Sequence, residues 1–314
     1  MKQCFFLLVV YVLVISGIWA HASDGANVVV FSYNRPLQLE LFLRSLHEYV
    51  TGIASIHVIY RADTEKYNDG YDILKSEYPA ITFIRQSDNP TGDFKELTLR
   101  ATFSTQTPYI VFAVDDIVVK EPFSLPATVA LLEKHQAYGF YLRLGIHITY
   151  CYSENYPVHA HDLKEVEPDV FSWTFSQGNG DWGYPHSVDM VLYRKADVRV
   201  DLEQLAYTSP NTLEAAWAAR GISMRIKNKK GLCYTTTKIV NIPLNRVQTN
   251  FYNRSMNLYS PEELLDLFFD GYRIDYAPLH GIRNESPHME YEPTFINKYN
   301  ESSHHNIPQV ELCT

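Results

Sequence analysis

Along the first half of the chain, short apolar segments alternate with segments whose apolar residues recur at helical spacing. The apolar segments are rich in β-branched and aromatic residues and have the length of buried strands. They are Asn27–Phe31, Ile56–Tyr60, Ile81–Ile84 and Tyr109–Val114. Helices are expected at Leu37–Tyr49, before Tyr78-Pro79, and at Phe94–Phe103. This alternation predicts an α/β fold, in which helices flank a mostly parallel sheet.

The second half of the chain has a less regular pattern. Helices are expected near Ser124–His135, Asn211–Arg220 and Pro261–Phe269, and strands at Gly139–Leu144, Val188–Tyr193 and Ser223–Ile226. Aromatic residues mix with glycines over Cys151–Pro185, which favours loops that face a ligand or that are merely structural. No repeat or low-complexity linker interrupts the pattern. We therefore expect one domain over residues 26–280, followed by a polar C-terminal tail at 281–314.

Residues 1–22 have the pattern of a targeting segment. Lys2 precedes an uncharged apolar run, and Ala20-His21-Ala22 matches a small-x-small cleavage site. Left uncleaved, the same run is nearly long enough to anchor the chain in a bilayer. We therefore expect a signal peptide or signal anchor that directs the protein into the secretory pathway or to export, with the Golgi lumen as one destination.

Composition narrows the kind of partner. The net charge is −9 and both signs are interspersed, so the basic surface that nucleic-acid binding requires is not expected. Cys151, Cys233 and Cys313 follow the targeting segment, an odd number that permits at most one internal disulfide. Acceptor sequences for N-glycosylation occur at Asn253, Asn284 and Asn300, so a eukaryotic source would make the chain a glycoprotein.

Two adjacent carboxylates, Asp115 and Asp116, come directly after the apolar segment Tyr109–Val114. In open α/β sheets, ligands bind at the carboxyl ends of the strands. Magnesium and similar hard cations take oxygen ligands, typically one or two carboxylates together with the phosphates of a substrate. The pair therefore predicts a metal held against a diphosphate. The alternative is an acidic turn in which one aspartate caps the next element.

Taken together, these features resemble the nucleotide-sugar half of GT-A-fold glycosyltransferases, especially the family 2-like enzymes. The resemblance rests on the order of Ser32-Tyr33-Asn34-Arg35-Pro36, three β-α units and Val114-Asp115-Asp116-Ile117, and it covers roughly Asn27–Gly221. It implies a Rossmann-like GT-A fold with a nucleotide-sugar half at residues 26–120 and an acceptor half at 121–280.

The resemblance also implies roles for individual residues near the nucleotide. Arg35, and more loosely Arg61 and Asp63, would contact the nucleoside, and Lys95 would face the nucleotide. Asp116 would ligate the metal, whereas Asp115 would lie near the ribose or the donor sugar.

Further along the chain, Glu214 in Leu213-Glu214-Ala215 resembles the catalytic base on the family's acceptor helix. The family's usual Glu-Asp pair is absent, because Thr212-Leu213 stands before Glu214. A glutamate that only interacts with the helix dipole is the alternative. Asp181 and Asp189 are competing candidates for the base or for binding acceptor hydroxyls.

Two residues are candidates for the metal and the diphosphate. His288 is expected as a further metal ligand, since several metal-dependent GT-A enzymes recruit a C-terminal histidine, and a surface histidine is the alternative. Arg246 would meet the diphosphate or be a surface cation.

These features predict a glycosyltransferase that depends on Mn²⁺ or Mg²⁺ and moves a sugar from a nucleotide-sugar donor to a glycan, lipid or protein acceptor. One carboxylate base is sufficient for an inverting reaction, whereas a retaining reaction, which would require a different constellation, is the alternative. A non-catalytic glycan-binding protein on the same fold is one alternative. A sugar nucleotidyltransferase is another, although Ser32–Pro36 lacks the glycine-rich, basic phosphate loop such enzymes usually carry.

Overall fold

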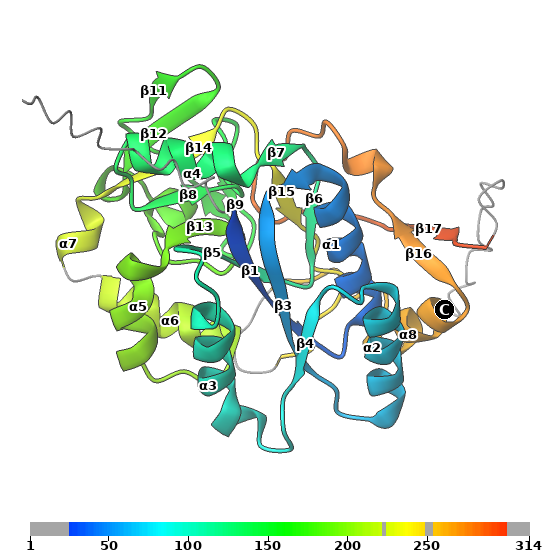
Figure 1. Ribbon diagram of the computed structural model, residues 1–314. Coiled ribbons are helices and arrows are strands. Elements are labelled where there is room, and N and C mark those ends of the chain that lie inside the picture. The colour runs from blue at the N-terminus through cyan, green and yellow to red at the C-terminus, as the bar shows by residue number, and fades with distance from the viewer. Residues whose placement is uncertain (1–24, 222–223, 249–253, 300–314) are drawn as a thin grey trace, which may run out of the picture.

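The computed structural model describes residues 25–221, 224–248 and 254–299. A nine-stranded sheet runs through the molecule in the order β11-β12-β14-β8-β13-β5-β1-β3-β4, and helices cover it (Figure 1). Its strands are β1 (Ala26–Tyr33), β3 (Ile53–Arg61), β4 (Thr82–Arg85), β5 (Tyr109–Val114), β8 (Gly139–Tyr141), β11 (Lys164–Glu167), β12 (Val170–Thr174), β13 (Val191–Arg194) and β14 (Lys230–Tyr234).

The four strands at one end of the sheet, β5, β1, β3 and β4, are all parallel, because β1, β3 and β4 are each followed by a helix that returns the chain to the opposite edge. These helices are α1 (Pro36–Tyr49), α2 (Glu65–Glu77) and α3 (Pro90–Phe103). Residues of β1 alternate between the two faces. Val28 and Val30 join the core beneath α1, whereas Val29 and Phe31 join the core beneath α3. The predicted α/β fold, with a sheet flanked by helices, is confirmed.

The rest of the sheet contains antiparallel pairs. β13 lies antiparallel between β5 and β8, and β12 lies antiparallel to β14 and β11. Helices α4 (Leu125–Lys134), α5 (Lys195–Gln204) and α6 (Pro210–Gly221) belong to this half. Shorter strands lie outside the main sheet, in the pairs β2 (Val50–Thr51) with β7 (Phe123–Ser124), β6 (Ile117–Val119) with β15 (Ile239–Asn241), and β9 (Tyr150–Cys151) with β10 (Tyr156–Pro157).

Three strand predictions need correction. The segment predicted as a strand at Ser223–Ile226 is wrong, because Met224–Lys227 forms the short helix α7. β8 ends at Tyr141 rather than Leu144, and β13 begins at Val191 rather than Val188. Met190 has a φ of 50°, outside the extended region, so no strand can pass through it.

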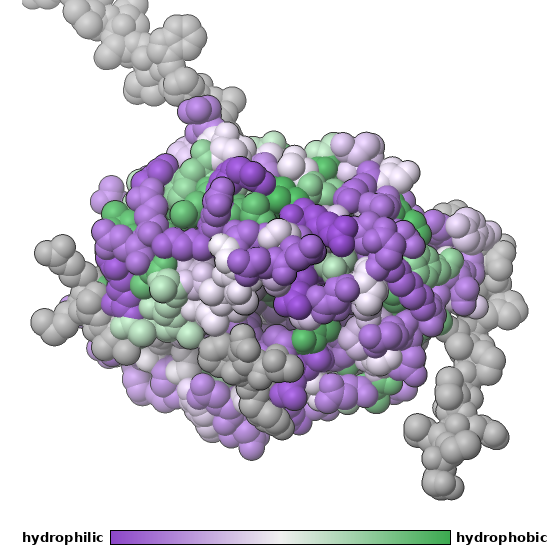
Figure 2. Space-filling model, turned by 90° about the horizontal axis from the view of Figure 1, so that it is seen from below, coloured by the Kyte–Doolittle hydropathy of each residue, from purple (hydrophilic) through white to green (hydrophobic). Residues whose placement is uncertain are grey.

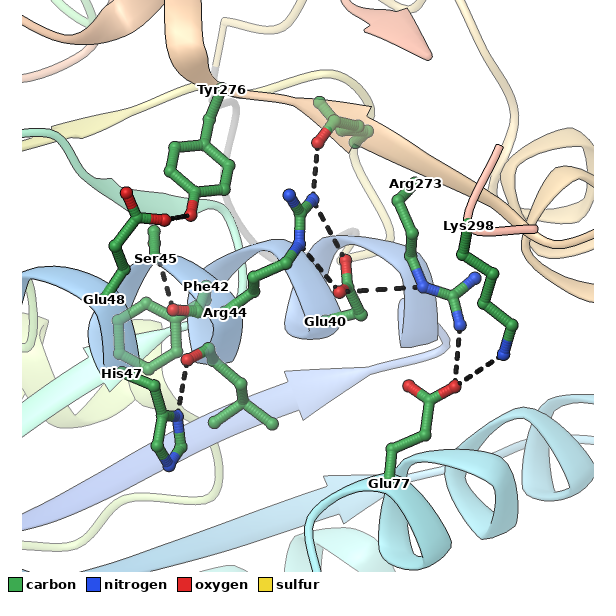
Figure 3. Close-up of polar contacts among 12 residues, drawn as sticks. Glu40, Phe42, Arg44, Ser45, His47, Glu48, Glu77, Arg273, Tyr276 and Lys298 are labelled. Carbon is green, nitrogen blue, oxygen red and sulfur yellow. Dashed lines mark hydrogen bonds and ion pairs between the residues drawn. The ribbon is translucent and has the colours of Figure 1, made fainter. Parts of the chain in front are cut away.

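The C-terminal segment packs on the fold. Helix α8 (Pro261–Phe269), which begins with a capping box at Ser260, leads into β16 (Tyr272–Asp275), and β16 pairs with β17 (Thr294–Asn297). Ion pairs join this segment to α1 and α2, as Figure 3 shows. Arg273 and Lys298 each lie 2.9 Å from Glu77, and Arg273 lies 3.6 Å from the buried Glu40. The described part of the expected polar tail is therefore integrated into the domain.

Three observations concern export and modification. Asn284 is buried, accepts a hydrogen bond from Thr237 and donates one to the carbonyl of Ser286, so the folded protein does not present it for glycosylation. Asn253, Asn300, Cys313 and residues 1–22 lie outside the described residues. Cys151 and Cys233 are both free thiols. Among the helices of the described ranges, none combines the length and apolarity that crossing a bilayer requires.

Candidate active site

The candidate site lies where the parallel strands end, at the lower edge of the sheet in Figure 1. Figure 2 shows this face from below, with hydrophilic residues gathered around its hollowed centre. The turn after β1 begins the site. Asn34 has a φ of 52°, and Pro36 starts α1 with its ring at a position that needs no N–H donor. This sharp turn buries the Arg35 side chain beside the end of β5.

Arg35 joins three parts of the site. Its Nη1 lies 3.0 Å from Oδ1 of Asp115 and 3.5 Å from Oδ2 of Asp116. Its Nε donates to Oδ1 of Asn245 at 2.9 Å, and its Nη2 donates to the Asn245 carbonyl. The guanidinium therefore offsets the charge of both aspartates and fixes the segment that follows β15.

The two aspartates have different surroundings. Asp115 is 3% exposed and accepts a hydrogen bond from the Tyr33 amide at 3.1 Å as well as the one from Arg35. Asp116 is more open, since its side chain keeps 19% of its accessible surface against 5% for Asp115. Asp115 is thus committed to holding the turn, whereas Asp116 is the carboxylate that a ligand can reach.

A second group of polar residues faces Asp116 from elsewhere in the chain. Asn241 ends β15 and is brought to the site because β15 pairs with β6, the strand directly after Asp116. Its Nδ2 lies 3.3 Å from Oδ1 of Asp116 and 3.3 Å from Oδ1 of Asp189. His288 and Asn241 form an isolated parallel β-bridge. The Nε2 atom of His288 lies 3.8 Å from Oδ2 of Asp189. The structure therefore brings Asp116, Asp189 and His288 to one place.

This group has an excess of negative charge. Burial raises the pKa of the Asp189 carboxyl, and the nearby charge of Asp116 raises it further, while His288 and Arg143 oppose the shift. The Oδ1 atom of Asn241 is buried and has no hydrogen-bond partner. As the described side chains stand, no three from His, Cys, Asp and Glu are arranged to hold a metal ion.

Glu214 and Asp181 are the other two acidic candidates for the base. Glu214 is on α6, and its Oε1 accepts a hydrogen bond from the amide of Val188 at 2.8 Å. Burial, with the charge of Asp189, raises the pKa of Glu214 to about 7. Asp181 lies on the short helix η2 (Gly180–Gly183) and pairs with Arg143, 2.5 Å from its Nη1. Of these two residues, Glu214 is suited to general acid–base chemistry, because its pKa is near neutrality.

The predicted nucleoside residues form a cluster at the mouth of the site. Arg61 pairs with Asp63 at 2.7 Å and lies over the ring of Tyr33, 4.3 Å from its centroid. Asp63 also accepts hydrogen bonds from the Tyr33 hydroxyl and from Asn34 Nδ2. The turn after β1 and the loop after β3 are thus joined, and Tyr33 presents a partly exposed ring beside Asp63.

Lys95 and Arg246, which were predicted near the nucleotide and the diphosphate, have other surroundings. Lys95 donates to the carbonyls of Glu203 and Leu205 at 2.8 and 2.7 Å, where α5 ends. Its ammonium group therefore holds α5 to α3, and it is not brought together with the carboxylates of the site. Arg246 is exposed on the segment after β15, next to Asn245, which binds Arg35.

Sequence reasoning missed Arg143, Asn241 and Asn245. The sequence held a weak signal for Asn241 and Asn245, because each asparagine ends a short apolar run, and asparagine is depleted in strands. Arg143 stands at the end of the predicted strand Gly139–Leu144, and only its burial in the folded protein reveals its role.

No family model matches the chain. The bifunctional glycosyltransferase pgtA of Dictyostelium discoideum is 24% identical over 278 residues, which cover 77% of this chain and 35% of that protein. The chain therefore spans about a third of the length of this curated relative. The match confirms the predicted resemblance to glycosyltransferases.

Two solved structures show a weaker likeness. S. aureus TarS in complex with UDP-GlcNAc is 12% identical with a TM-score of 0.43, covering 75% of this chain and 61% of that one. The mannosyltransferase PcManGT from Pyrobaculum calidifontis, in complex with GDP-Man and Mn²⁺, is 12% identical with a TM-score of 0.37, covering 67% and 54%.

Proposed function

We propose that this chain, a relative of a glycosyltransferase, transfers a sugar from a nucleoside-diphosphate donor to a hydroxyl of a glycan or glycoconjugate with the help of a divalent cation. The observation that carries the proposal is the meeting of Asp116, Asp189 and His288 at the carboxyl end of β5, beside a glutamate with a pKa of about 7. A cation site next to a proton acceptor is what glycosyl transfer from a diphosphate requires.

Asp116 and His288 are side chains of the types that bind a cation such as Mn²⁺. Asp116 is the accessible carboxylate, and His288 reaches the same group of residues from the C-terminal segment. The charge of Asp116 raises the pKa of Asp189, so the two carboxylates oppose each other's ionisation, and a bound cation would relieve that repulsion. We assign Asp116 and His288 as the residues that would hold it. When bound, the cation would stabilise the negative charge that develops on the leaving diphosphate.

The remaining residues at this edge of the sheet suit the rest of the donor. The Tyr33 ring, covered on one face by Arg61, and the Asp63 carboxylate lie at the ends of β1 and β3, where the carboxylate can accept a hydrogen bond from a nucleoside hydroxyl or amide. Asp115 is buried and already bonded to Arg35 and the Tyr33 amide, so its part is to shape the turn rather than to bind the sugar directly.

Glu214 is the proton acceptor in this proposal. Its carboxylate is held by the Val188 amide, and the backbone from Val188 to Asp189 connects it to the group around Asp116. With one carboxylate as the base, an inverting reaction is the simplest course. Asp181 is less suited because its carboxylate is engaged by Arg143.

Incubation with a panel of nucleotide-sugars, with and without candidate acceptors, tests the proposal. The expected result is release of free nucleoside diphosphate that requires a divalent cation and rises with the correct acceptor. Release of inorganic diphosphate from a nucleoside triphosphate and a sugar phosphate would instead identify a nucleotidyltransferase. Binding of glycans without any turnover would identify a glycan-binding protein.

A further inference from the structure

Arg143 follows β8 and is one of the most deeply buried charged residues of the described chain, at 2% exposure. A buried guanidinium is costly unless its five donors find acceptors. Arg143 uses Nη1 to bind Asp181, but its Nε and Nη2 atoms are buried without a hydrogen-bond partner. A single buried ion pair with unsatisfied donors contributes little to stability. The arrangement therefore points to a role other than holding the fold.

The surroundings of Arg143 come from three separate parts of the chain. Asp181, Asp189 and Glu214 are the charged groups that act on it most strongly, in that order. Backbone hydrogen bonds explain why they converge. The amide of Leu142 binds the carbonyl of Met190, which places Arg143 beside Asp189, and Val188 in turn binds Glu214. One cation thus stands among three carboxylates.

Asp181 is held firmly from its other side. The indole of Trp182 donates to the carbonyl of Ile148 at 3.0 Å, and the indole of Trp173 donates to the carbonyl of Trp182 at 2.7 Å. Both rings are 1% exposed. Because η2 cannot move without breaking these bonds, the pair with Asp181 fixes the position of the Arg143 guanidinium relative to Glu214.

We propose that Arg143 is a positioning residue that supplies the positive charge around which Asp181, Asp189 and Glu214 gather, and that it thereby keeps the proton acceptor of the transfer reaction in its working state. This inference rests on the proposed function for its catalytic part, but the charge cluster itself does not. The groups near Glu214 support it: Asp189 disfavours the ionised carboxyl, whereas Arg143 and the hydrogen bonds from Val188 and Ser187 favour it. The charge of Glu214 also acts on the hydroxyls of Tyr184 and Tyr193. Removing the cation leaves the like charges unopposed.

The first measurement needs no catalysis. Urea unfolding of the wild type, Arg143→Met, Asp181→Asn and the double variant is followed at about pH 5.5 and about pH 8. Glu214, with a pKa of about 7, is ionised at pH 8 but not at pH 5.5, so Arg143→Met, which removes the cation that offsets its charge, should lose more at pH 8 than at pH 5.5. Asp181→Asn added to Arg143→Met should restore part of that loss. An equal loss at both pH values, with additive effects in the double variant, would overturn the proposal.

The second measurement follows the pH dependence of transfer. In the wild type the acid limb is expected at a pH of about 7, set by Glu214. Arg143→Met should move it upward by about one unit or more, while Arg143→Lys, which keeps the charge, should leave it near the wild-type position. A purely structural role would lower the rate without moving the limb. If Arg143→Met does not fold, the pH profiles of Arg143→Lys and Asp181→Asn are compared instead. The proposal is contradicted if the acid limb stays in place in Asp181→Asn and moves upward in Arg143→Lys.

Arg273→Lys is the matched control. Arg273 is likewise a buried arginine, at 4% exposure, paired with Glu40 and Glu77 away from the site (Figure 3). It should cost stability and leave the acid limb unchanged. If no nucleotide-sugar were turned over by the wild type, the proposed function would fail, whereas the unfolding comparison would still decide whether Arg143 organises the carboxylates.

Discussion

The guanidinium of Arg35 binds Asn245 twice, through Nε to the side-chain oxygen and through Nη2 to the backbone carbonyl. With Nη1 on Asp115, every edge of the guanidinium is occupied within the protein. Arg35 was predicted to contact the nucleoside. Within the folded chain, its contacts join the turn after β1, the end of β5 and the segment after β15.

Arg35→Met should therefore destabilise the fold strongly. The change leaves the buried Asp115 carboxylate without its partner, and breaking a buried pair in this way costs about 3–5 kcal/mol. Urea unfolding measures the loss. Arg254→Met is the control, because Arg254 pairs with Glu290 on the surface and such exposed pairs contribute about 0–1 kcal/mol. Similar losses in the two variants would show that burial of the Arg35 pair does not matter.

Asp116→Asn should remove the dependence of nucleotide binding on the metal. Asp116 is the accessible carboxylate of the proposed cation site, and an amide is a weaker ligand for a hard cation. Calorimetry with a nucleoside diphosphate, Mn²⁺ or Mg²⁺, and a chelator compares the two proteins. The wild type should bind tightly only with the cation, and the variant should bind weakly under both conditions. Equal affinity of the wild type with and without the chelator would rule out the metal role.

Glu214→Gln should keep donor binding and lose transfer. The amide preserves shape but cannot accept the proton, so the rate should fall by the roughly 10²–10⁴-fold that general base catalysis supplies. Asp181→Asn and Asp189→Asn are measured beside it. Near-normal transfer in Glu214→Gln, with loss of transfer and retained donor binding in one of the other variants, would assign the base to that aspartate.

The same glutamate predicts a pH dependence of stability. The pKa of Glu214 is raised from 4.5 to about 7 in the folded protein, so the folded state binds a proton that the unfolded state releases between these values. Stability should therefore rise as the pH falls from about 8 toward about 5, relative to Glu214→Gln, which does not titrate. Transfer should change in the opposite direction, since the base must be ionised. Parallel stability profiles of the wild type and Glu214→Gln would contradict the raised pKa.

The N-terminal segment is expected to direct translocation. We propose that Lys2 and the apolar run before Ala20-His21-Ala22 target the chain to a membrane. Expression with and without residues 1–22 in a eukaryotic host tests this. The full chain should appear in secreted or membrane fractions and resist added protease in sealed vesicles, whereas the shortened chain should stay in the cytosol. A full-length chain that remains soluble in the cytosol would refute the prediction.

The sequence was informative where local pattern and fold agree. The strand at Tyr109–Val114 and the helix after Asn34-Arg35-Pro36 could be predicted, because a buried parallel strand and an amphipathic helix each have a distinct period. The aspartates at the end of that strand were recognised for the same reason. Their different exposure could not be foreseen, because it depends on Arg35 and on a turn closed by Tyr33.

Other parts of the site depend on contacts between distant segments. Asp189 was expected to interrupt a strand, but the strand begins only after Met190, and the turn before it presents Asp189 to Asn241 and His288. Lys95 has a side-chain type suited to a nucleotide site, but α5 packs on α3, and the Lys95 ammonium group binds the carbonyls of Glu203 and Leu205 at the end of α5. Neither outcome is encoded in local periodicity, because each is decided by which surfaces meet after folding.

The pairing of Asn241 with His288 has a consequence for how the protein is made. The backbone of Asn241 binds the carbonyl of Pro287 and the amide of Met289, so the candidate site is closed by residues from the last part of the described chain. During synthesis the strands β1, β3, β4 and β5 leave the ribosome first and can assemble as a sheet with Arg35 already against Asp115. Neither His288 nor Asn241 is then in place. A nascent or proteolysed chain that ends before His288 therefore lacks one of the residues that line the candidate site, even where its β1–β5 sequence is intact.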